Sequence, residues 1–145
     1  MSDTRQLLTG VSVVAIGDRA LMIEGPPGSG KSSLALALID RGAILIGDDG
    51  VSLLREGDRL IAAPPPSVSG VIEIRNVGLV EMAVAPPTPL ALLLSLERDA
   101  ERLPEHAARR DIAGGSVPAL GFTPGTIAPA MRAEAAMREH GLIFD

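Results

Sequence analysis

A glycine-rich stretch at residues 25–32 constrains this chain more than any other feature. It reads Gly-Pro-Pro-Gly-Ser-Gly-Lys-Ser, which fits the P-loop pattern of a glycine, four residues and then Gly-Lys-Ser/Thr. In such a loop small residues let backbone N–H groups close around phosphate oxygens, a lysine contacts the β- and γ-phosphates, and a serine hydroxyl coordinates Mg²⁺. The pattern predicts a nucleoside-triphosphate site. Its expected phosphate-binding residues are Gly25, Pro26, Pro27, Gly28, Ser29, Gly30, Lys31, Ser32 and Ser33.

The flanking residues support this interpretation, because a P-loop joins a strand to a helix. An apolar run at residues 20–23 precedes the loop, and residues 33–41 are rich in strong helix formers. Gly42 then stands where a glycine commonly ends a helix. Lys31 is the only lysine of the chain, so general solubility does not explain its place. The alternative, a surface turn rich in glycine and proline, does not account for this order.

Length and composition fit one domain, expected over residues 1–145. A chain of this size can bury a substantial core, and 46% apolar with 21% charged residues is typical of soluble globular proteins. With two Phe and no Tyr or Trp, the core must be aliphatic. Few side chains are therefore available to stack on an adenine ring, and we expect weak base selectivity.

Charge and cysteine content exclude several classes of protein. A net charge of −5 argues against broad nucleic-acid binding, which needs clustered Lys and Arg. The absence of cysteine excludes disulfides and thiolate zinc sites. Residues 1–6 are polar, without the apolar core of a signal peptide, and no apolar run approaches the roughly 20 residues that span a membrane. We expect a cytoplasmic protein without a membrane partner.

The pattern of apolar residues predicts an α/β fold with a mixed, strand-rich sheet. We expect strands at residues 11–16, 20–24, 43–46, 51–55, 59–63, 71–75, 78–85 and 90–96, and helices at 31–41 and 128–140. The run at 90–96 also allows a helix, but its length and flanking prolines favour a buried strand. We expect residues 98–108 to be partly helical and residues 114–125 to form a loop.

Asp48 and Asp49 follow the strand that comes after the P-loop helix. Ligands of open α/β sheets bind at the carboxyl ends of strands, so this pair and the P-loop should share one crevice. One carboxylate there can hold Mg²⁺, and the other can take a proton from an attacking hydroxyl. Adjacent residues of a regular strand face opposite sides, so both can act only if the strand ends or bends here, which Gly47 and Gly50 permit. The alternative is ordinary Asp-Asp-Gly turn chemistry.

Glu73 and the two histidines give weaker signals. On an alternating strand Glu73 shares a face with Val71 and Arg75, and by itself it favours an exposed strand charge paired with that arginine. His106 and His140 fit solvated positions, and we assign them no role.

Four segments together resemble a known family: residues 25–33, 38–42, 46–49 and 70–80. They are similar to the catalytic domain of HPr kinase/phosphorylase, in the short form that lacks the usual N-terminal domain. The Glu-Ile-Arg-x-x-Gly segment, at residues 73–78, is the family's signature and is much more specific than a P-loop. The resemblance extends over roughly residues 7–104 and is less clear beyond them.

The resemblance implies both a fold and an activity. The family has a P-loop core related to that of phosphoenolpyruvate carboxykinase. Its members use ATP and Mg²⁺ to phosphorylate a serine of HPr, a phosphocarrier protein of the phosphotransferase system, and remove that phosphate with inorganic phosphate. Full-length members form hexamers, so the resemblance implies a homo-oligomer.

The resemblance also implies roles for individual residues. Asp49 matches the family's proton acceptor and donor, Lys31 the P-loop lysine and Ser32 a magnesium ligand. Glu73 matches a second magnesium-site carboxylate, a role that the residues by themselves did not favour. Asp48 would lie near the same metal, which leaves Asp49 as the general base. Arg102, in a Glu-Arg-Leu-Pro segment, matches a functional arginine.

Two departures from the family pattern leave other functions open. Thr9 stands where the family usually has a histidine, and residues 122–126 align with a late loop whose arginines are missing here. One alternative function is a P-loop kinase of small molecules. Another is a nucleotide-binding regulator with little or no turnover.

Overall fold

The computed structural model describes residues 5–66 and 70–144. Within them the strands are β1 (Arg5–Thr9), β2 (Ser12–Ile16), β3 (Arg19–Glu24), β4 (Ile44–Gly47), β5 (Gly50–Glu56), β6 (Arg59–Ala63), β7 (Val71–Ile74), β8 (Gly78–Glu81), β9 (Thr88–Leu96), β10 (Ala108–Ile112) and β11 (Gly115–Phe122). The helices are α1 (Lys31–Asp40) and α2 (Pro129–His140). Both helices and all eight strands expected from the sequence are present, with ends that shift by a few residues.

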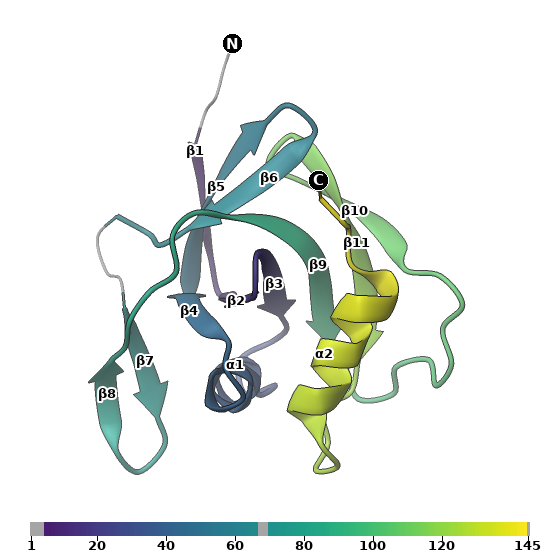
Figure 1. The fold of residues 1–145 in the computed structure, drawn as a ribbon. Coiled ribbons are helices and arrows are strands. Elements are labelled where there is room, and N and C mark those ends of the chain that lie inside the picture. The colour runs from purple at the N-terminus through teal and green to yellow at the C-terminus, as the bar shows by residue number, and fades with distance from the viewer. Residues whose placement is uncertain (1–4, 67–69, 145) are drawn as a thin grey trace.

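Nine of these strands form one curved sheet (Figure 1). Its main path has the strand order β1-β5-β6-β9-β3-β2-β4, and β11 joins this path at β9 and pairs with β10. The pairs of β9 with β3 and with β11 are parallel, whereas the other strand pairs of the described residues are antiparallel. The expected α/β fold with a mixed, strand-rich sheet is confirmed.

Strand β9 lies at the centre because it is apolar on both faces. Leu92 and Leu94 belong to the core beneath the helices, while Leu90 and Leu93 belong to a second core on the opposite face. All four are at most 1% exposed. A strand covered on both faces reads as a continuous apolar run, which is why alternation is absent here. The buried strand expected at 90–96 is confirmed and begins at Thr88.

Both helices cover the same face of the sheet (Figure 1). Helix α1 buries Leu34, Ala35 and Leu38 against it. An ion pair of 2.8 Å between Arg41 and Glu134 links the end of α1 to α2. This packing fixes the start of α1, where the P-loop ends. Within residues 5–66 and 70–144, no helix is long and apolar enough to cross a membrane.

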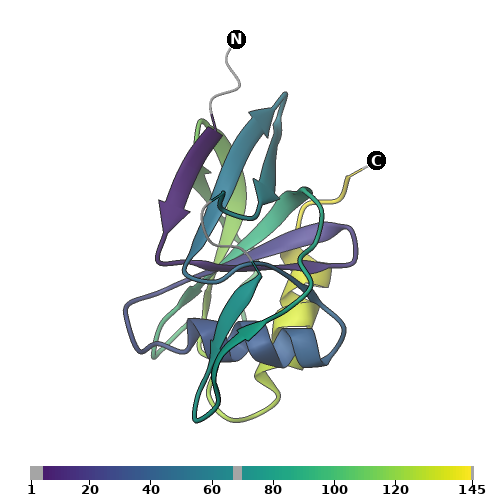
Figure 2. The same ribbon diagram turned by 90° about the vertical axis from the view of Figure 1, so that its left-hand side faces the viewer.

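Strands β7 and β8 form a separate two-stranded sheet that lies across α1 (Figure 2). Ile72 is fully buried in the helix-side core, and this contact anchors the hairpin. The strand expected at 78–85 is shorter, because β8 ends at Glu81 and only an isolated bridge joins Val84 to Leu45. The hairpin therefore stands apart from the main sheet, beside the P-loop helix.

Two expectations were wrong, both in the last third of the chain. Residues 98–108 contain no helix, and β10 begins at Ala108. Residues 115–122 form β11 and not a loop. Their glycines and a proline lower the β propensity of the segment, but pairing with β10 over residues 115–119 and with β9 over residues 119–122 outweighs it. Pro118 is tolerated because the ladder with β9 begins only at Ala119.

Candidate active site

The P-loop joins β3 to α1 through a backbone that glycine makes possible. Gly28 and Gly30 have φ angles of 80° and 102°, a left-handed region that disfavours side chains. Helix α1 begins directly after Gly30, and no side chain caps its first turn. Its first N–H groups therefore remain available to an anion, and the helix dipole favours negative charge there.

Lys31, the first residue of α1, turns back over the loop. Its Nζ donates hydrogen bonds to the backbone oxygens of Gly25 at 2.8 Å and of Pro26 at 3.2 Å. The ammonium group is thereby held above the loop that would cradle phosphates. No acidic side chain neutralises it within the described residues, so its charge remains available to a phosphate.

Ser32 contacts the first of the two aspartates. Its hydroxyl donates to Oδ1 of Asp48 at 2.8 Å, and the hydroxyl of Ser12 donates to the same oxygen at 2.8 Å. Asp48 follows β4, Ser12 begins β2 and Ser32 lies in the first turn of α1. The three elements thus meet at one carboxylate oxygen.

A sharp turn between β4 and β5 brings both aspartates to the same side. Asp49 has a φ of 64°, so the chain does not continue as a regular strand. A Cβ at Gly47 would collide with the backbone oxygen of Gly50, so the turn requires glycine at that position. The backbone N–H of Gly10 donates to the oxygen of Asp49 at 3.1 Å and fixes the turn against the end of β1. The bend that both carboxylates need is therefore present.

One cavity of about 460 Å³ collects these groups. It is lined by Ser12, Lys31, Ser32, Asp48, Asp49, Val71, Glu73 and Leu79. The β7–β8 hairpin brings Glu73, and its cross-strand neighbour Leu79, to the P-loop. The carboxylates of Asp49 and Glu73 have no hydrogen-bond partner in the described part of the chain. They are thus free to accept a proton or bind a cation.

The donor set suits Mg²⁺, because hydroxyl and carboxylate oxygens are the ligands this ion prefers. Ser32, Asp48 and Glu73 supply such oxygens within the cavity. Among the described residues no three His, Cys, Asp or Glu side chains gather closely enough to form a metal site. Mg²⁺ is usually held by one or two carboxylates together with substrate phosphates and water, so this arrangement fits an ion bound with a nucleotide.

Comparison with known families accords with this geometry. The model of the HPr Serine kinase C-terminal domain matches residues 3–123. The chain belongs to this family.

Individual relatives of the HPr kinase family show how far the similarity extends. HPr kinase/phosphorylase of Verminephrobacter eiseniae is 36% identical over 130 residues, which cover 80% of the chain and 40% of that protein. That of Lacticaseibacillus casei is 35% identical over 101 residues, 64% of the chain and 31% of that protein. The chain thus spans about two fifths or less of the length of these relatives.

A solved structure gives the same picture of the fold. The Hpr(Ser) kinase/phosphatase from Coxiella burnetii matches with a TM-score of 0.78 and 28% sequence identity. The match covers 92% of the chain and 94% of that one. The HPr kinase fold therefore extends over nearly the whole chain.

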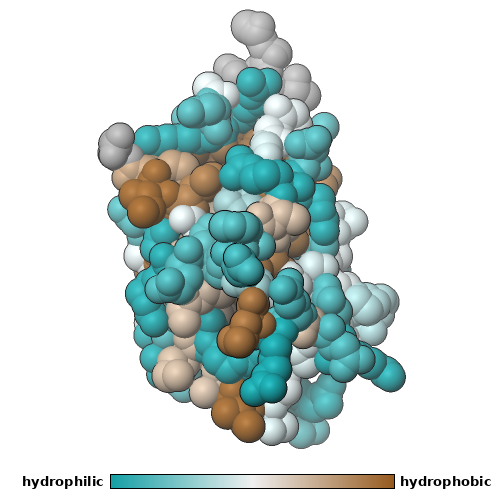
Figure 3. Space-filling model, turned by 90° about the vertical axis from the view of Figure 1, so that its right-hand side faces the viewer, coloured by the Kyte–Doolittle hydropathy of each residue, from teal (hydrophilic) through white to brown (hydrophobic). Residues whose placement is uncertain are grey.

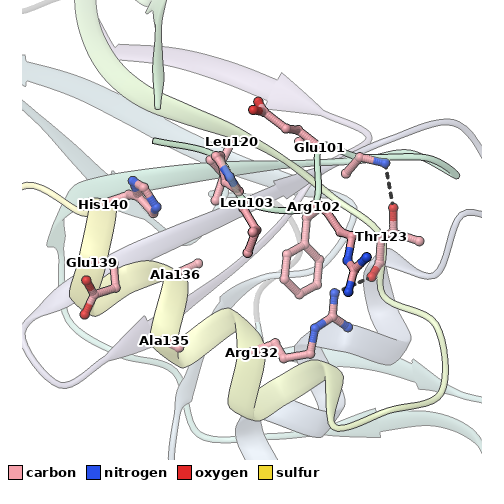
Figure 4. Close-up of a pocket in the computed structure, with 14 residues that line it drawn as sticks. Glu101, Arg102, Leu103, Leu120, Thr123, Arg132, Ala135, Ala136, Glu139 and His140 are labelled. Carbon is pink, nitrogen blue, oxygen red and sulfur yellow. Dashed lines mark hydrogen bonds between the residues drawn. The ribbon is translucent and has the colours of Figure 1, made fainter. Parts of the chain in front are cut away.

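Arg102 lies in a different cavity from the other residues that the family resemblance singled out. This cavity, of about 690 Å³, is formed by residues 100–104, the end of β11 and helix α2 (Figure 4). Figure 3 shows this side of the molecule, where hydrophobic groups are scattered among hydrophilic ones. Figure 4 shows the guanidinium groups of Arg102 and Arg132 close to Thr123. Arg102 does not line the cavity that contains Lys31.

A third cavity lies on the other flank of the P-loop. It has a volume of about 520 Å³, and Pro26–Ser29 of the loop line one side while Arg98, Thr123 and Pro124 line the other. Arg132 of α2 supports this side by donating to the backbone oxygens of Thr123 at 2.7 Å and Pro124 at 2.8 Å. Residues 122–126, which lack the family's arginines, are therefore hydrogen-bonded to an arginine of α2, Arg132.

A bidentate ion pair between Arg110 and Glu24 lies where β3 leads into the P-loop. Arg110 of β10 contacts both carboxylate oxygens of Glu24, the last residue of β3, at 2.9 Å each. The Arg110 hydrogen bond lowers the pKa of Glu24; burial opposes this shift, and a hydrogen bond from Ser95 adds to it. The same pair raises the pKa of Arg110. The pair ties the β10–β11 hairpin to the base of the loop.

Sequence reasoning missed Ser12, Arg98 and the pair of Glu24 with Arg110. Ser12 had one available signal, because it is a single hydroxyl within an otherwise apolar strand. The others had none, since their roles depend on the positions of β10 and β11. The sequence predicted no strand at either place: residues 98–108 were expected to be partly helical and residues 114–125 to form a loop.

Proposed function

We propose that this chain is an ATP- and Mg²⁺-dependent serine kinase whose acceptor is HPr or a close relative of it. The observation that carries the proposal is the single cavity in which Lys31, Ser32, Asp48, Asp49 and Glu73 meet. The family membership and the names of its relatives supply the acceptor. We also propose that the chain folds as one domain and that it assembles into a homo-oligomer, a hexamer by family resemblance.

The P-loop residues would bind and orient the nucleotide. Backbone N–H groups of the loop and of the first turn of α1 face the phosphates, and Lys31 moves from its loop carbonyls to the β- and γ-phosphates. Ser32 and Glu73, with Asp48 beside them, would hold Mg²⁺, which would supply positive charge against those phosphates. Arg98 lines a cavity together with Pro26–Ser29 of the P-loop, and Arg102 lines a further cavity that also includes Thr123.

Asp49 would act as the general base. Its exposed carboxylate has no partner among the described residues, whereas Oδ1 of Asp48 already accepts two hydrogen bonds. Asp49 takes the proton of the acceptor serine hydroxyl while the oxygen of that hydroxyl bonds to the γ-phosphorus. The bond from that phosphorus to the bridging oxygen of ADP breaks, and ADP leaves. In the dephosphorylation direction, an oxygen of inorganic phosphate bonds to the phosphorus of phosphoserine and the bond from the serine oxygen to that phosphorus breaks, which gives pyrophosphate. Protonated Asp49 returns the proton to the serine oxygen.

Intact-mass measurement after incubation with ATP, Mg²⁺ and HPr of the same organism tests this proposal. We expect HPr to gain one phosphate group, and Lys31→Ala to prevent it. Phosphate on a metabolite in place of HPr would indicate a small-molecule kinase, and nucleotide binding without transfer would indicate a regulator. A second incubation, of phosphorylated HPr with inorganic phosphate, tests the reverse reaction. Light scattering of the purified protein tests the proposed hexamer.

A further inference from the structure

Ser12 is a buried hydroxyl in an apolar strand. It is 1% exposed, and every other residue of β2 is apolar. A buried hydroxyl costs free energy unless it is hydrogen-bonded. Ser12 meets this requirement through Oδ1 of Asp48 and no other group within the described residues. The partner is thus a residue of the cavity, and not the backbone of a neighbouring strand.

A local irregularity of the sheet creates this contact. Strands β2 and β4 pair Ala15 with Ile44 and Val14 with Leu45, but the register then shifts and Val13 pairs with Gly47. Without the shift Ser12 would lie opposite Gly47. With it, Ser12 lies opposite Asp48. Irregularities of this kind commonly re-aim side chains beside active sites.

The contact restricts how Asp48 can behave. Two hydroxyl groups, from Ser12 and Ser32, donate to the same oxygen at 2.8 Å. This holds the carboxylate against the first turn of α1. Because the Ser32 proton is directed to Asp48, the lone pairs of the Ser32 oxygen remain for a cation in the cavity. Asp48 can fix the orientation of Ser32 only while its own orientation is fixed.

We propose that Ser12 is a positioning residue that holds Asp48 against Ser32 and thereby sets the oxygen ligands for Mg²⁺. Ser12 itself touches neither substrate nor metal. The proposal rests on the magnesium-nucleotide part of the proposed function and goes beyond it by assigning a role to a residue outside the P-loop, the Asp pair and the signature segment.

The test measures ATP binding by calorimetry at a series of free Mg²⁺ concentrations, with chemical unfolding in EDTA as a second readout. We expect Ser12→Ala to raise the half-saturating Mg²⁺ concentration by about 10-fold, the lower end of the usual effect of losing an outer-shell partner. ATP binding in EDTA should be unchanged. Ser12→Cys, which keeps the volume but donates weakly, covers the case in which the alanine variant does not fold. Ser52→Ala is the matched control, because Ser52 is also a buried strand serine, 2% exposed, and lies outside the cavity.

A purely structural role for Ser12 would give a different result. Ser12→Ala would then lose stability and keep the wild-type Mg²⁺ requirement, which would overturn the inference. In an Asp48→Asn background, Ser12→Ala should have no further effect, because it acts through that carboxylate. An additive effect also overturns it. If the wild type binds ATP without any Mg²⁺ dependence, the magnesium part of the proposed function fails as well. If the wild type requires Mg²⁺ and Ser12→Ala has the same requirement, this inference alone fails.

Discussion

Asp49 combines a proposed catalytic role with a strained backbone, so Asp49→Gly should raise stability while it lowers turnover. Its φ of 64° lies in the left-handed region, which costs an L-residue about 1–2 kcal/mol. Aspartate and asparagine tolerate this region better than other residues. Strain of this kind is often retained at functional sites. The informative series is Asp49→Gly, Asp49→Asn and Asp49→Ala.

The size of each effect follows from the backbone. Glycine relieves the strain but adds about 0.5–1 kcal/mol of chain entropy to the unfolded state, which leaves a net gain of about 0.5–1 kcal/mol. For a chain of 145 residues this raises Tm by about 1–4 °C. Asparagine should be nearly neutral. Alanine tolerates the left-handed region less well than aspartate does, so we expect Asp49→Ala to lose about 1 kcal/mol of stability.

Transfer should fall in all three variants. Loss of an acid–base group lowers the rate by about 10²–10⁴-fold, and positioning by the P-loop leaves a residual rate. Thermal unfolding and single-turnover transfer to HPr measure the two properties, with Asp48→Asn as the matched control. If Asp49→Asn transfers phosphate at the wild-type rate, the assignment of the base is wrong. If only Asp48→Asn is inactive, the two roles are exchanged. A glycine variant less stable than the alanine variant would refute the strain argument.

Three further predictions concern the rest of the site. Lys31→Ala should weaken ATP binding by about 10–100-fold in calorimetry, as expected for lost charge-assisted hydrogen bonds, and unchanged affinity would contradict the P-loop assignment. Glu73→Gln should raise the Mg²⁺ requirement of transfer, whereas Glu81→Gln on the same hairpin should not; equal behaviour of the two would remove Glu73 from the metal site. The pKa of Glu24 is lowered from its ordinary value of 4.5, so the ionised carboxylate stabilises the fold at pH values above 4.5. This contribution is lost as the pH falls through the pKa of Glu24 in the folded protein. Arg110→Gln, which removes part of a half-exposed pair, should therefore cost about 0.5–1 kcal/mol at pH 7 in urea unfolding, and the difference should vanish in acid; a difference independent of pH would contradict this reasoning.

The sequence determined the parts of the site that lie close together along the chain. The P-loop, the helix that begins at Lys31 and the aspartate pair 17 and 18 residues later follow from local patterns, because a strand, a glycine-rich loop and a helix can be read from neighbouring residues. The bend at Asp49 was also foreseeable, since Gly47 and Gly50 flank the pair. Local propensity decides these elements, and tertiary contacts only confirm them.

Tertiary structure decided what pairing of distant strands controls. The sequence did not show that residues 115–122 form a strand, because pairing with β10 and, from Ala119 onward, with β9 overrides the low β propensity of their glycines. It did not place Glu73 on a separate hairpin beside the P-loop, or Arg102 in a different cavity from Lys31. The contact of Ser12 with Asp48 depends on one shift of register between β2 and β4. Register depends on which faces of two distant segments can be buried together, and neither segment carries that information by itself.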